Sequence, residues 1–490
     1  MKRPMFCGAL IAIACIIISY INNKTTLLCG VGLICFLLMI LTDKIDMKKL
    51  SAFVAATLVF ISLLNTSKTI DRIDKLNGEV ITETLDITDV KRTVDYCSVT
   101  GSIISGNTLP KSTKLVLYVD SSYSGITMGD RVTCNIKITT ISKRENKTYY
   151  YSKGVYAIGY LERVIERHSD NIFLRRAGNI KRYVKMNIAA TMKEENAATL
   201  LGITIGDKDM FNQMFADNVR RTGVSHVMVV SGMHLTIILG ALFWFLDRIC
   251  YNSYVRFIIS FIAIAFIVSI CGFTLSIIRA GLMFFFMALA PLVKRDSDSI
   301  NSLGTAIIII SMFCPFAILN VGFQLSALAT FGIIYIVPFI ESHLTVKNPF
   351  LRDIILSLSV TLSATITTLP ISIYHFGYVS LVSPITNILI SFAVTYALCI
   401  GIIGILLRKF EFLRFVSNIV LAVCEAIVSY INYIINTLGS WPLAAISVGK
   451  VTFYISLLFT VSVLLFIYTC KNNENLLKSI YKKKKREVAK

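Results

Sequence analysis

The sequence predicts a polytopic α-helical membrane protein of about twelve spans that carries a small extracytoplasmic β-barrel. Of its 490 residues, 55% are hydrophobic and only 16% are charged, which is typical of a chain with many long apolar helices rather than one water-soluble core. A polar segment between residues 65 and 171 interrupts these runs with short strand-like stretches, and it predicts the barrel. A water-soluble protein is excluded.

Apolar windows long enough to cross about 30 Å of hydrocarbon predict the spans. The first window follows Lys2 and Arg3 but lacks a small-x-small cleavage site, so we interpret it as a retained signal anchor. The windows are residues 5–21, 25–42, 50–64, 226–246, 256–272, 275–293, 300–318, 321–340, 354–374, 384–407, 413–437 and 450–469.

Lys and Arg between these windows set the orientation, because short cytoplasmic loops are rich in both residues. When successive spans cross the membrane in opposite directions, the basic clusters all fall on one side. They are Lys2, Arg3, Lys44, Lys48, Lys49, Arg248, Arg256, Lys294, Arg295, Lys347, Arg352, Arg408, Lys409, Arg414 and residues 482–486. We therefore expect a multi-pass protein of the cytoplasmic membrane with both termini in the cytoplasm. The net charge of +20 comes mostly from these loops.

The extracytoplasmic segment has the strand and turn pattern of a small barrel of the OB type. Turns are predicted at Gly106-Asn107 and Gly129-Asp130. The expected strands are 79–87, 96–105, 114–119, 131–140 and 149–164. The expected parts of the chain are N-terminal spans (1–64), the β domain (65–171), amphipathic interfacial helices (172–225), a membrane core (226–470) and a basic cytoplasmic tail (471–490).

Ten of the twelve cysteines lie within or beside apolar windows, where cysteine usually packs as a small hydrophobe. Cys97 and Cys134 are the two in the extracytoplasmic domain, and a disulfide between them would stabilise the barrel by roughly 3–4 kcal/mol. The alternative is a pair of free core thiols. The sequence has no CxxC pair or Cys/His cluster, so we expect no metal and no cofactor.

The helical segment 172–221 interleaves Lys181, Arg182, Lys185 and Lys193 with apolar residues, as helices at a membrane surface do. Within it, residues 200–209 contain two glycines and a lysine. They lack the spacing of a phosphate-binding loop and the strand that should precede it, so we do not predict an ATPase.

Four sequence blocks carry a family resemblance. The run from Arg220 to Leu235 (RRTGVSHVMVVSGMHL) resembles the signature GLSHLLAISGLH of the ComEC-type competence family. Three further blocks are similar to segments of that family: 273–280 (FTLSIIRA), 301–304 with 320–326 (NSLG and NVGFQLS), and 368–384 with its TLP, YHFG and SP elements. The blocks occur in the family's order.

The resemblance implies a channel that passes single-stranded DNA across the cytoplasmic membrane during natural competence, with an external OB-like domain. It also implies a surface DNA receptor, a competence pilus and a cytoplasmic helicase-like motor as partners. Many relatives continue into a metallo-β-lactamase-like domain, whose metal site requires a histidine cluster. This sequence has five histidines and no such cluster. Any strand-degrading activity is therefore expected in a separate nuclease or not at all.

Polar residues inside apolar windows are costly and are candidates for function. We interpret Arg279 as facing phosphate or lining a pore, the alternative being a structural pair with Glu425 or with helix-end carbonyls. His226 and His234 are eight residues apart and are expected on one helical face beside Ser231. A pore or packing network fits them better than a metal site or proton relay, because no carboxylates converge there.

Other candidates for a DNA path have equally simple structural alternatives. Arg220 and Arg221 suit a phosphate-binding entry ring or interfacial anchoring, and polar helix contacts explain Asn320 and Gln324 at least as well. The path candidates are Arg220, Arg221, Ser225, His226, Ser231, His234, Arg279, Asn320, Gln324 and His375. Glycines 223, 232, 322 and 377 and prolines 370 and 384 are expected to interrupt or shorten several core helices, and a polar conduit would satisfy the freed backbone groups.

Two other classes of function remain open from the sequence. A secondary transporter of a small solute would share the spans and midplane polar groups, but the segments show no two-fold repeat. A membrane-embedded hydrolase could use Ser231 and His234, but no oriented acid accompanies them. We therefore predict a passive DNA channel that is driven by its partners.

Overall fold

The computed structural model describes residues 3–22, 47–92, 97–106, 108–120, 125–169, 171–228 and 230–488. The predicted span 25–42 lies outside them. The chain divides into two compact units. The first contains Met1–Phe211, His226–Phe323 and Ala393–Asn432, and the second contains Asn212–Ser225, Gln324–Phe392 and Tyr433–Lys490.

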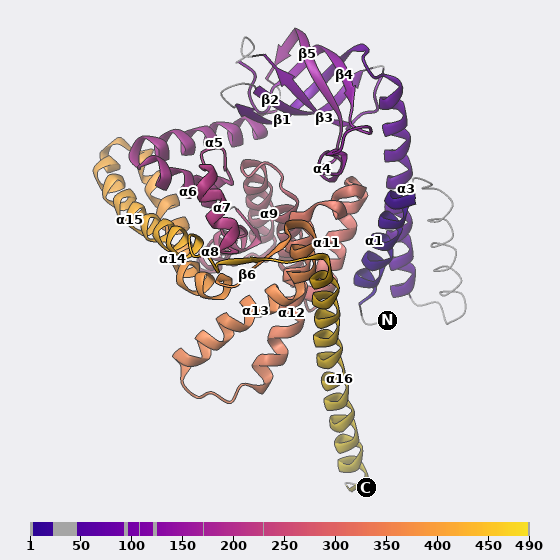
Figure 1. The fold of residues 1–490 in the computed structure, drawn as a ribbon, viewed down its shortest axis with the longest axis vertical. Helices are drawn as coiled ribbons and strands as arrows, with labels where there is room; N and C mark the ends of the chain where they lie inside the picture. The colour runs from indigo at the N-terminus through magenta and orange to yellow at the C-terminus, as the bar shows by residue number, and fades with distance from the viewer. Residues whose placement is uncertain are drawn as a thin grey trace. The chain divides into compact units, whose positions relative to one another are not determined.

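Helices dominate the described residues (Figure 1). Those up to the middle of the chain are α1 (Pro4–Asn22), α3 (Met47–Lys75), α4 (Lys147–Ser152), α5 (Ile172–Thr191), α6 (Glu194–Ile205), α7 (Gln213–Arg221), α8 (Gly232–Ile249) and α9 (Ser253–Ile270). The later ones are α10 (Leu275–Leu289), α11 (Ser299–Phe313), η2 (Pro315–Leu319), α12 (Val321–His343), α13 (Pro349–Phe376), α14 (Ser383–Arg408), η3 (Glu411–Leu413), α15 (Arg414–Gly439) and α16 (Lys450–Val488).

Eight helical segments in the described part of the chain are long and apolar enough to cross a membrane. They are Ser51–Lys75, Gly232–Ile249, Ser253–Ile270, Val321–His343, Pro349–Phe376, Ser383–Leu407, Glu411–Gly439 and Val451–Asn472. Three shorter apolar helices, Pro4–Ile17, Leu275–Leu289 and Ser299–Phe313, fall in predicted windows as well. The multi-helix membrane architecture is confirmed, and the count of twelve spans stays a prediction.

Five strands form a closed barrel in the first unit: β1 (Val80–Arg92), β2 (Cys97–Gly106), β3 (Lys114–Val119), β4 (Arg131–Thr140) and β5 (Val155–His168). Their order around the barrel is β1-β2-β3-β5-β4, with β3 and β5 parallel, which fits a five-stranded OB-like barrel. Alternate residues of β2, β3 and β4 are buried, as expected for strands that line a filled interior.

One predicted strand is partly wrong. Residues 149–152 belong to helix α4, and β5 begins only at Val155. The three consecutive tyrosines 149–151 suggested a strand because aromatic residues favour sheets. The chain instead turns at Gly154, whose φ of +73° suits glycine. α4 packs against η2, where Asn320 Nδ2 donates to Ser152 Oγ at 3.3 Å.

The predicted disulfide between Cys97 and Cys134 is also wrong, because both are free thiols. Cys97 pairs with Arg92 and Cys134 with Glu83 on opposite sides of β1. These β1 positions are nine residues apart, roughly 30 Å at about 3.3 Å per residue. A disulfide needs Cα atoms within about 7 Å. The two cysteines therefore lie near opposite ends of the barrel.

We accordingly expect mass mapping without reductant to find Cys97 and Cys134 unlinked and unequal in reactivity. Burial raises the pKa of the Cys134 thiol to about 12, and Glu83 acts in the same direction. Because the thiolate is the reactive form, iodoacetamide at pH 8 should spare Cys134 until the protein unfolds and should label the half-buried Cys97. A Cys97–Cys134 peptide in the native protein would contradict the barrel's register.

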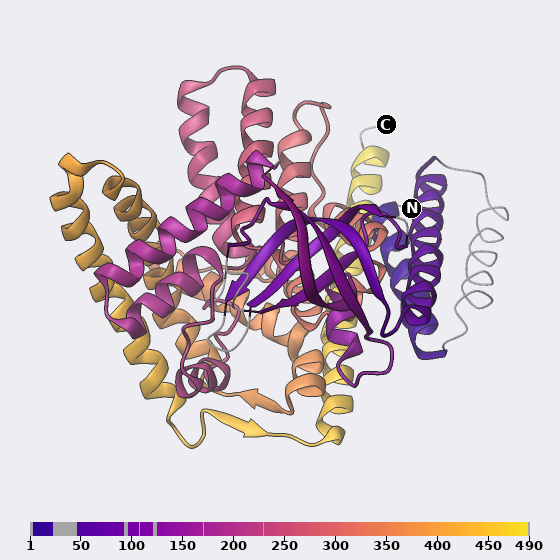
Figure 2. The same cartoon turned by 90° about the horizontal axis from the view of Figure 1, so that it is seen from above.

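Helices α1, α3 and α11 pack together in the first unit, and α1 and α3 run side by side in two views (Figures 1 and 2). The NSLG segment explains this packing. Asn301 Oδ1 accepts a hydrogen bond from the backbone N–H of Met5 at 3.1 Å, so it satisfies a donor in the first turn of α1. Asp298 caps α11 through the N–H of Asn301 and pairs with Arg3 at 3.0 Å.

The predicted interfacial segment contains the three helices α5, α6 and α7. α6 differs from the expectation of a surface helix, because nine of its twelve residues are buried. Gly206 ends α6 in the left-handed conformation (φ +76°), a helix C-cap rather than the start of a phosphate-binding loop. Asp207 then accepts from Lys185 Nζ at 2.8 Å, and this contact helps to lower the carboxyl pKa against the opposing effect of burial.

In the second unit, Pro370 lies inside α13 and does not end it. Proline frees the carbonyl four residues earlier, which here is that of Ile366. Thr460 on α16 donates its hydroxyl to this carbonyl at 2.8 Å, so the backbone stays satisfied without water. The expected break at Gly377 does occur, since it ends α13 with φ of +70°. Two short strands, β6 (Tyr378–Ser380) and β7 (Ala445–Ser447), pair beyond it.

Candidate functional site

The N-terminus of α8 holds two polar residues of the family signature, Ser231 and His234. Ser231 is the N-cap residue, with extended backbone (φ −127°, ψ 177°). Its backbone N–H donates to His234 Nδ1 at 3.1 Å, and its Oγ lies 3.0 Å from the same nitrogen. Because Nδ1 accepts a hydrogen bond from a backbone N–H, the neutral imidazole must carry its own proton on Nε2. The cap therefore fixes both the tautomer and the direction of the ring.

His234 is fully buried, at 0% exposure. Its Nε2 has no hydrogen-bond partner among the residues that the structure describes. A buried donor without a partner usually costs about 1–3 kcal/mol. The ring thus presents a fixed N–H inside the protein at a position where an acceptor would be stabilised.

Arg279 on α10 lies beside the start of α8 and is only 4% exposed. A Cβ placed on Gly232 would lie 3.2 Å from Arg279 Nη2 and 3.1 Å from Ala280 Cβ. Glycine at 232 therefore lets the guanidinium approach the first turn of α8. The N-terminus of a helix is itself partially positive, so the cation and the helix end reinforce each other. This arrangement favours an anion.

The surroundings of this site are apolar. The side chains that pack α8, α9 and α10 together form one buried cluster of Val230, Leu235, Leu239, Ile264, Val268, Cys271, Ile277 and Phe284. Charge interactions are stronger in such a low-dielectric setting than in water. The combination of a buried guanidinium, a fixed imidazole N–H and a helix N-terminus is chemically suited to a phosphate group.

A pair between Glu425 and Arg279 is the structural alternative that the sequence offers, and the structure contradicts it. Its Oε1 accepts from the backbone N–H of Lys193 at 2.9 Å and from Asn196 Nδ2 at 3.3 Å. The carboxylate thus lies at the N-terminus of α6, where helices stabilise negative charge. Glu425 serves α6 rather than Arg279.

The histidine face predicted for residues 226 and 234 is also wrong. α8 begins at Gly232, and residues 225–228 form turns, because Ser231 caps the helix and keeps the chain before it non-helical. His226 is therefore exposed in a turn, whereas His234 is buried. The eight-residue spacing therefore does not place the two histidines on one face of a helix.

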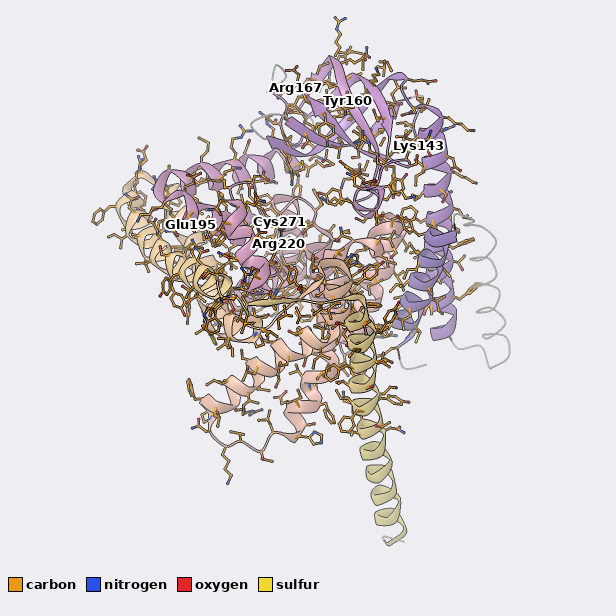
Figure 3. The ribbon with its side chains drawn as sticks, in the orientation of Figure 1. Lys143, Tyr160, Arg167, Glu195, Arg220 and Cys271 are labelled. Atoms are coloured by element: carbon orange, nitrogen blue, oxygen red, sulfur yellow. The ribbon has the colours of Figure 1, made fainter. Side chains whose placement is uncertain are left out.

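The remaining predicted residues lie elsewhere. In the second unit, Arg220 on α7, which is labelled in Figure 3, pairs with Asp217 at 2.9 Å. Arg221 donates to the Trp441 carbonyl at 2.6 Å. The hydroxyl of Ser225 lies 3.4 Å from the carbonyl oxygen of Val219.

Three more predicted residues sit at helix ends. His375 is exposed near the end of α13, and Gln324 is half-buried in the first turn of α12. In the first unit, Asn320 caps α12 by accepting from the N–H of Phe323 at 3.1 Å. Within the first unit, the structure thus places Arg279 beside the first turn of α8, where Ser231 and His234 form the N-cap.

Sequence reasoning missed a polar ladder between α6 and α15. Asn432 Nδ2 donates to Asn196 Oδ1 at 2.9 Å, and Thr199 donates to Asn432 Oδ1 at 2.8 Å. Asn196 also donates to Ser429 Oγ at 2.8 Å. The signal was present: residues 425, 429, 432 and 436 follow helical spacing and form one polar stripe on α15. Satisfied polar contacts of this kind hold membrane helices together.

The Ser231–His234 contact lacks one feature of a hydrolytic pair among the described residues. A serine nucleophile needs a base that a third group orients through its other nitrogen, and His234 Nε2 has no such group in the described part of the chain. No set of three or more His, Cys, Asp or Glu side chains there could hold a metal ion.

A family profile described as "Competence protein" matches residues 203–472. The chain belongs to the competence protein family. The match covers Ser231, His234 and Arg279. This competence protein is also 22% identical over 297 residues to ComE operon protein 3 of Bacillus subtilis (strain 168), an alignment of 59% of this chain and 36% of that relative. The chain thus spans about a third of the relative's length. No solved structure matches it.

Proposed function

We propose that this competence protein is a channel that passes single-stranded DNA through the cytoplasmic membrane during DNA uptake. The observation that carries the proposal is the buried Arg279 beside the first turn of α8, the turn that also contains the buried His234, inside an apolar helical core. Each phosphate that crosses hydrocarbon needs groups that replace water, and a guanidinium with a fixed N–H supplies them. Membership of the competence family supports DNA as the cargo.

The proposed channel is passive. Its energy would come from a cytoplasmic helicase-like motor, and its DNA from a surface receptor and a competence pilus. The proposed orientation places both termini in the cytoplasm and the barrel outside. In intact cells, a membrane-impermeant maleimide should then reach Cys97 in the barrel, and labelling only after lysis would reverse the orientation.

Deleting the gene and following labelled DNA in a transformable host tests the proposal. Surface-bound, nuclease-sensitive DNA should remain, and internalised, nuclease-resistant DNA should disappear. Reintroducing the gene should restore internalisation. Normal transformation in the deletion strain would contradict the channel function.

A further inference from the structure

One row of side chains crosses the outer face of the barrel. Tyr118 on β3 pairs with Tyr160 on β5, and Tyr160 pairs with Lys137 on β4. Ser98 on β2 and Val80 on β1 continue the row at its two ends. The alternate positions, such as Leu117 and Ile138, are buried in the barrel. Because strand side chains alternate between faces, the row points outward.

The two tyrosines of this row form a stacked pair. Their ring centroids are 5.8 Å apart at an interplanar angle of 27°. Tyr160 is 47% exposed, and its position on the barrel can be followed in Figure 3. A hydrogen bond with Tyr150, which belongs to α4, together with burial raises the pKa of Tyr118 to about 12. Tyr118 is thus neutral and held by α4, and Tyr160 leaves aromatic surface in contact with solvent.

Basic side chains surround the pair. Lys137 is exposed beside Tyr160, and exposed Arg163 follows on the same strand, opposite Asn135. The charge of Arg144 acts on Tyr118. Two exposed acidic residues are also near the pair: Glu162, at the irregularity in the β4–β5 pairing, and Asp120, two residues after Tyr118. Exposed cations therefore lie beside the exposed aromatic surface, with Lys137 directly next to Tyr160.

We propose that this row, defined as Ser98, Tyr118, Tyr160, Lys137 and Val80, stacks the bases of a single DNA strand before it enters the membrane region. The inference rests on the proposed DNA-uptake function. Bases of any sequence stack on aromatic rings while nearby cations bind the phosphates. OB folds bind oligonucleotides on the face of strands 2 and 3, which here contributes Ser98 and Tyr118. A duplex hides its base faces and cannot stack in this way.

The test measures the binding of a short fluorescein-labelled oligothymidylate to the purified full chain by fluorescence anisotropy. Tyr160→Leu should weaken binding by about 5- to 100-fold, and Tyr160→Phe should bind like the wild type because its ring remains. Ile165→Ala is the matched control, since Ile165 is 50% exposed on the same strand outside the row. Gel filtration and thermal unfolding confirm that each variant is folded.

The contribution of charge is tested separately. Lys137→Gln should reduce the salt dependence of binding by about 0.7 in the log–log slope, and Lys111→Gln, an exposed lysine in the turn before β3, should not. An unlabelled strand should compete better than a duplex of the same sequence.

Three results would overturn the inference: wild-type affinity in Tyr160→Leu, equal competition by duplex, or displacement of the probe by an N-acetylglucosamine oligosaccharide, which also stacks on aromatic rings. None of these results would contradict the channel proposal, because internalisation in the deletion strain is measured independently. Conversely, normal transformation without the gene would remove the channel function even if the barrel binds the probe.

Discussion

Arg279→Ala should lower the rate of DNA internalisation by about 10²-fold, the size of effect that follows loss of one fixed donor in a dry site. Surface DNA binding should persist, because Arg279 is buried beside the start of α8. Arg279→Lys should recover only part of the rate, since lysine offers a point charge instead of a planar fork. Nuclease-resistant labelled DNA per cell is the measurement.

Arg248→Ala is the matched control for this experiment. Arg248 lies in the last turn of α8 and covers the exposed ring of Trp244 at 3.6 Å from its centroid, so its loss should leave internalisation unchanged. A well-inserted Arg279→Ala protein that internalises DNA normally would remove Arg279 from the mechanism. Loss of folded protein from the membrane would instead identify Arg279 as a structural residue.

Two substitutions at position 234 separate the roles of the imidazole nitrogens. Asparagine keeps an acceptor near Nδ1 and so retains the cap on Ser231, but it lacks the buried Nε2–H. Glutamine reaches toward Nε2 with an amide donor and loses the cap. If the N–H faces phosphate, His234→Gln should retain more internalisation than His234→Asn at equal membrane levels. The reverse order would show that only the cap matters.

Hydropathy and alternation predicted the elements of this fold well, because each is a local property of the chain. The window at 275–293 contains α10, the window at 300–318 covers all but the first residue of α11, and two strands, 114–119 and 131–140, have the predicted bounds. The errors occurred where tertiary contacts decide. The tyrosines 149–151 have strand propensity but pack as α4 against η2, and no local pattern carries that contact.

The candidate site was predictable in composition and not in geometry. Arg279 and His234 are conspicuous because they lie in apolar runs. The approach of Arg279 to the first turn of α8, however, depends on the absence of a Cβ at Gly232. The direction of the His234 ring depends on the cap at Ser231. Neither can be read from the sequence before the helices form and pack. Likewise, the two cysteines of the β domain suggested a disulfide, but only the strand register shows that β1 keeps them far apart. Which side chains come into contact is decided only when the chain packs.

Gly304 provides the sharpest example of such a contact, and Gly304→Ala should destabilise the protein by about 1–3 kcal/mol. A Cβ at this position of α11 would lie 2.4 Å from the Cα and 2.6 Å from the backbone nitrogen of Phe6 on α1. Backbone atoms cannot rotate away from an added Cβ as a side chain can. Helix α1 must therefore shift, which strains the hydrogen bond from the Met5 N–H to Asn301 Oδ1. Small residues permit this close approach between membrane helices.

Gly240→Ala should instead stabilise the protein. Because the two variants are expected to change stability in opposite directions, together they give a strict test. Gly240 lies inside α8, and a Cβ there meets nothing within 4 Å. Because alanine is a better helix former than glycine, this variant should gain up to about 1 kcal/mol. Thermal unfolding of both purified variants in detergent should move in opposite directions from the wild type. A rise in midpoint for Gly304→Ala would show that α1 does not pack on α11 through this glycine.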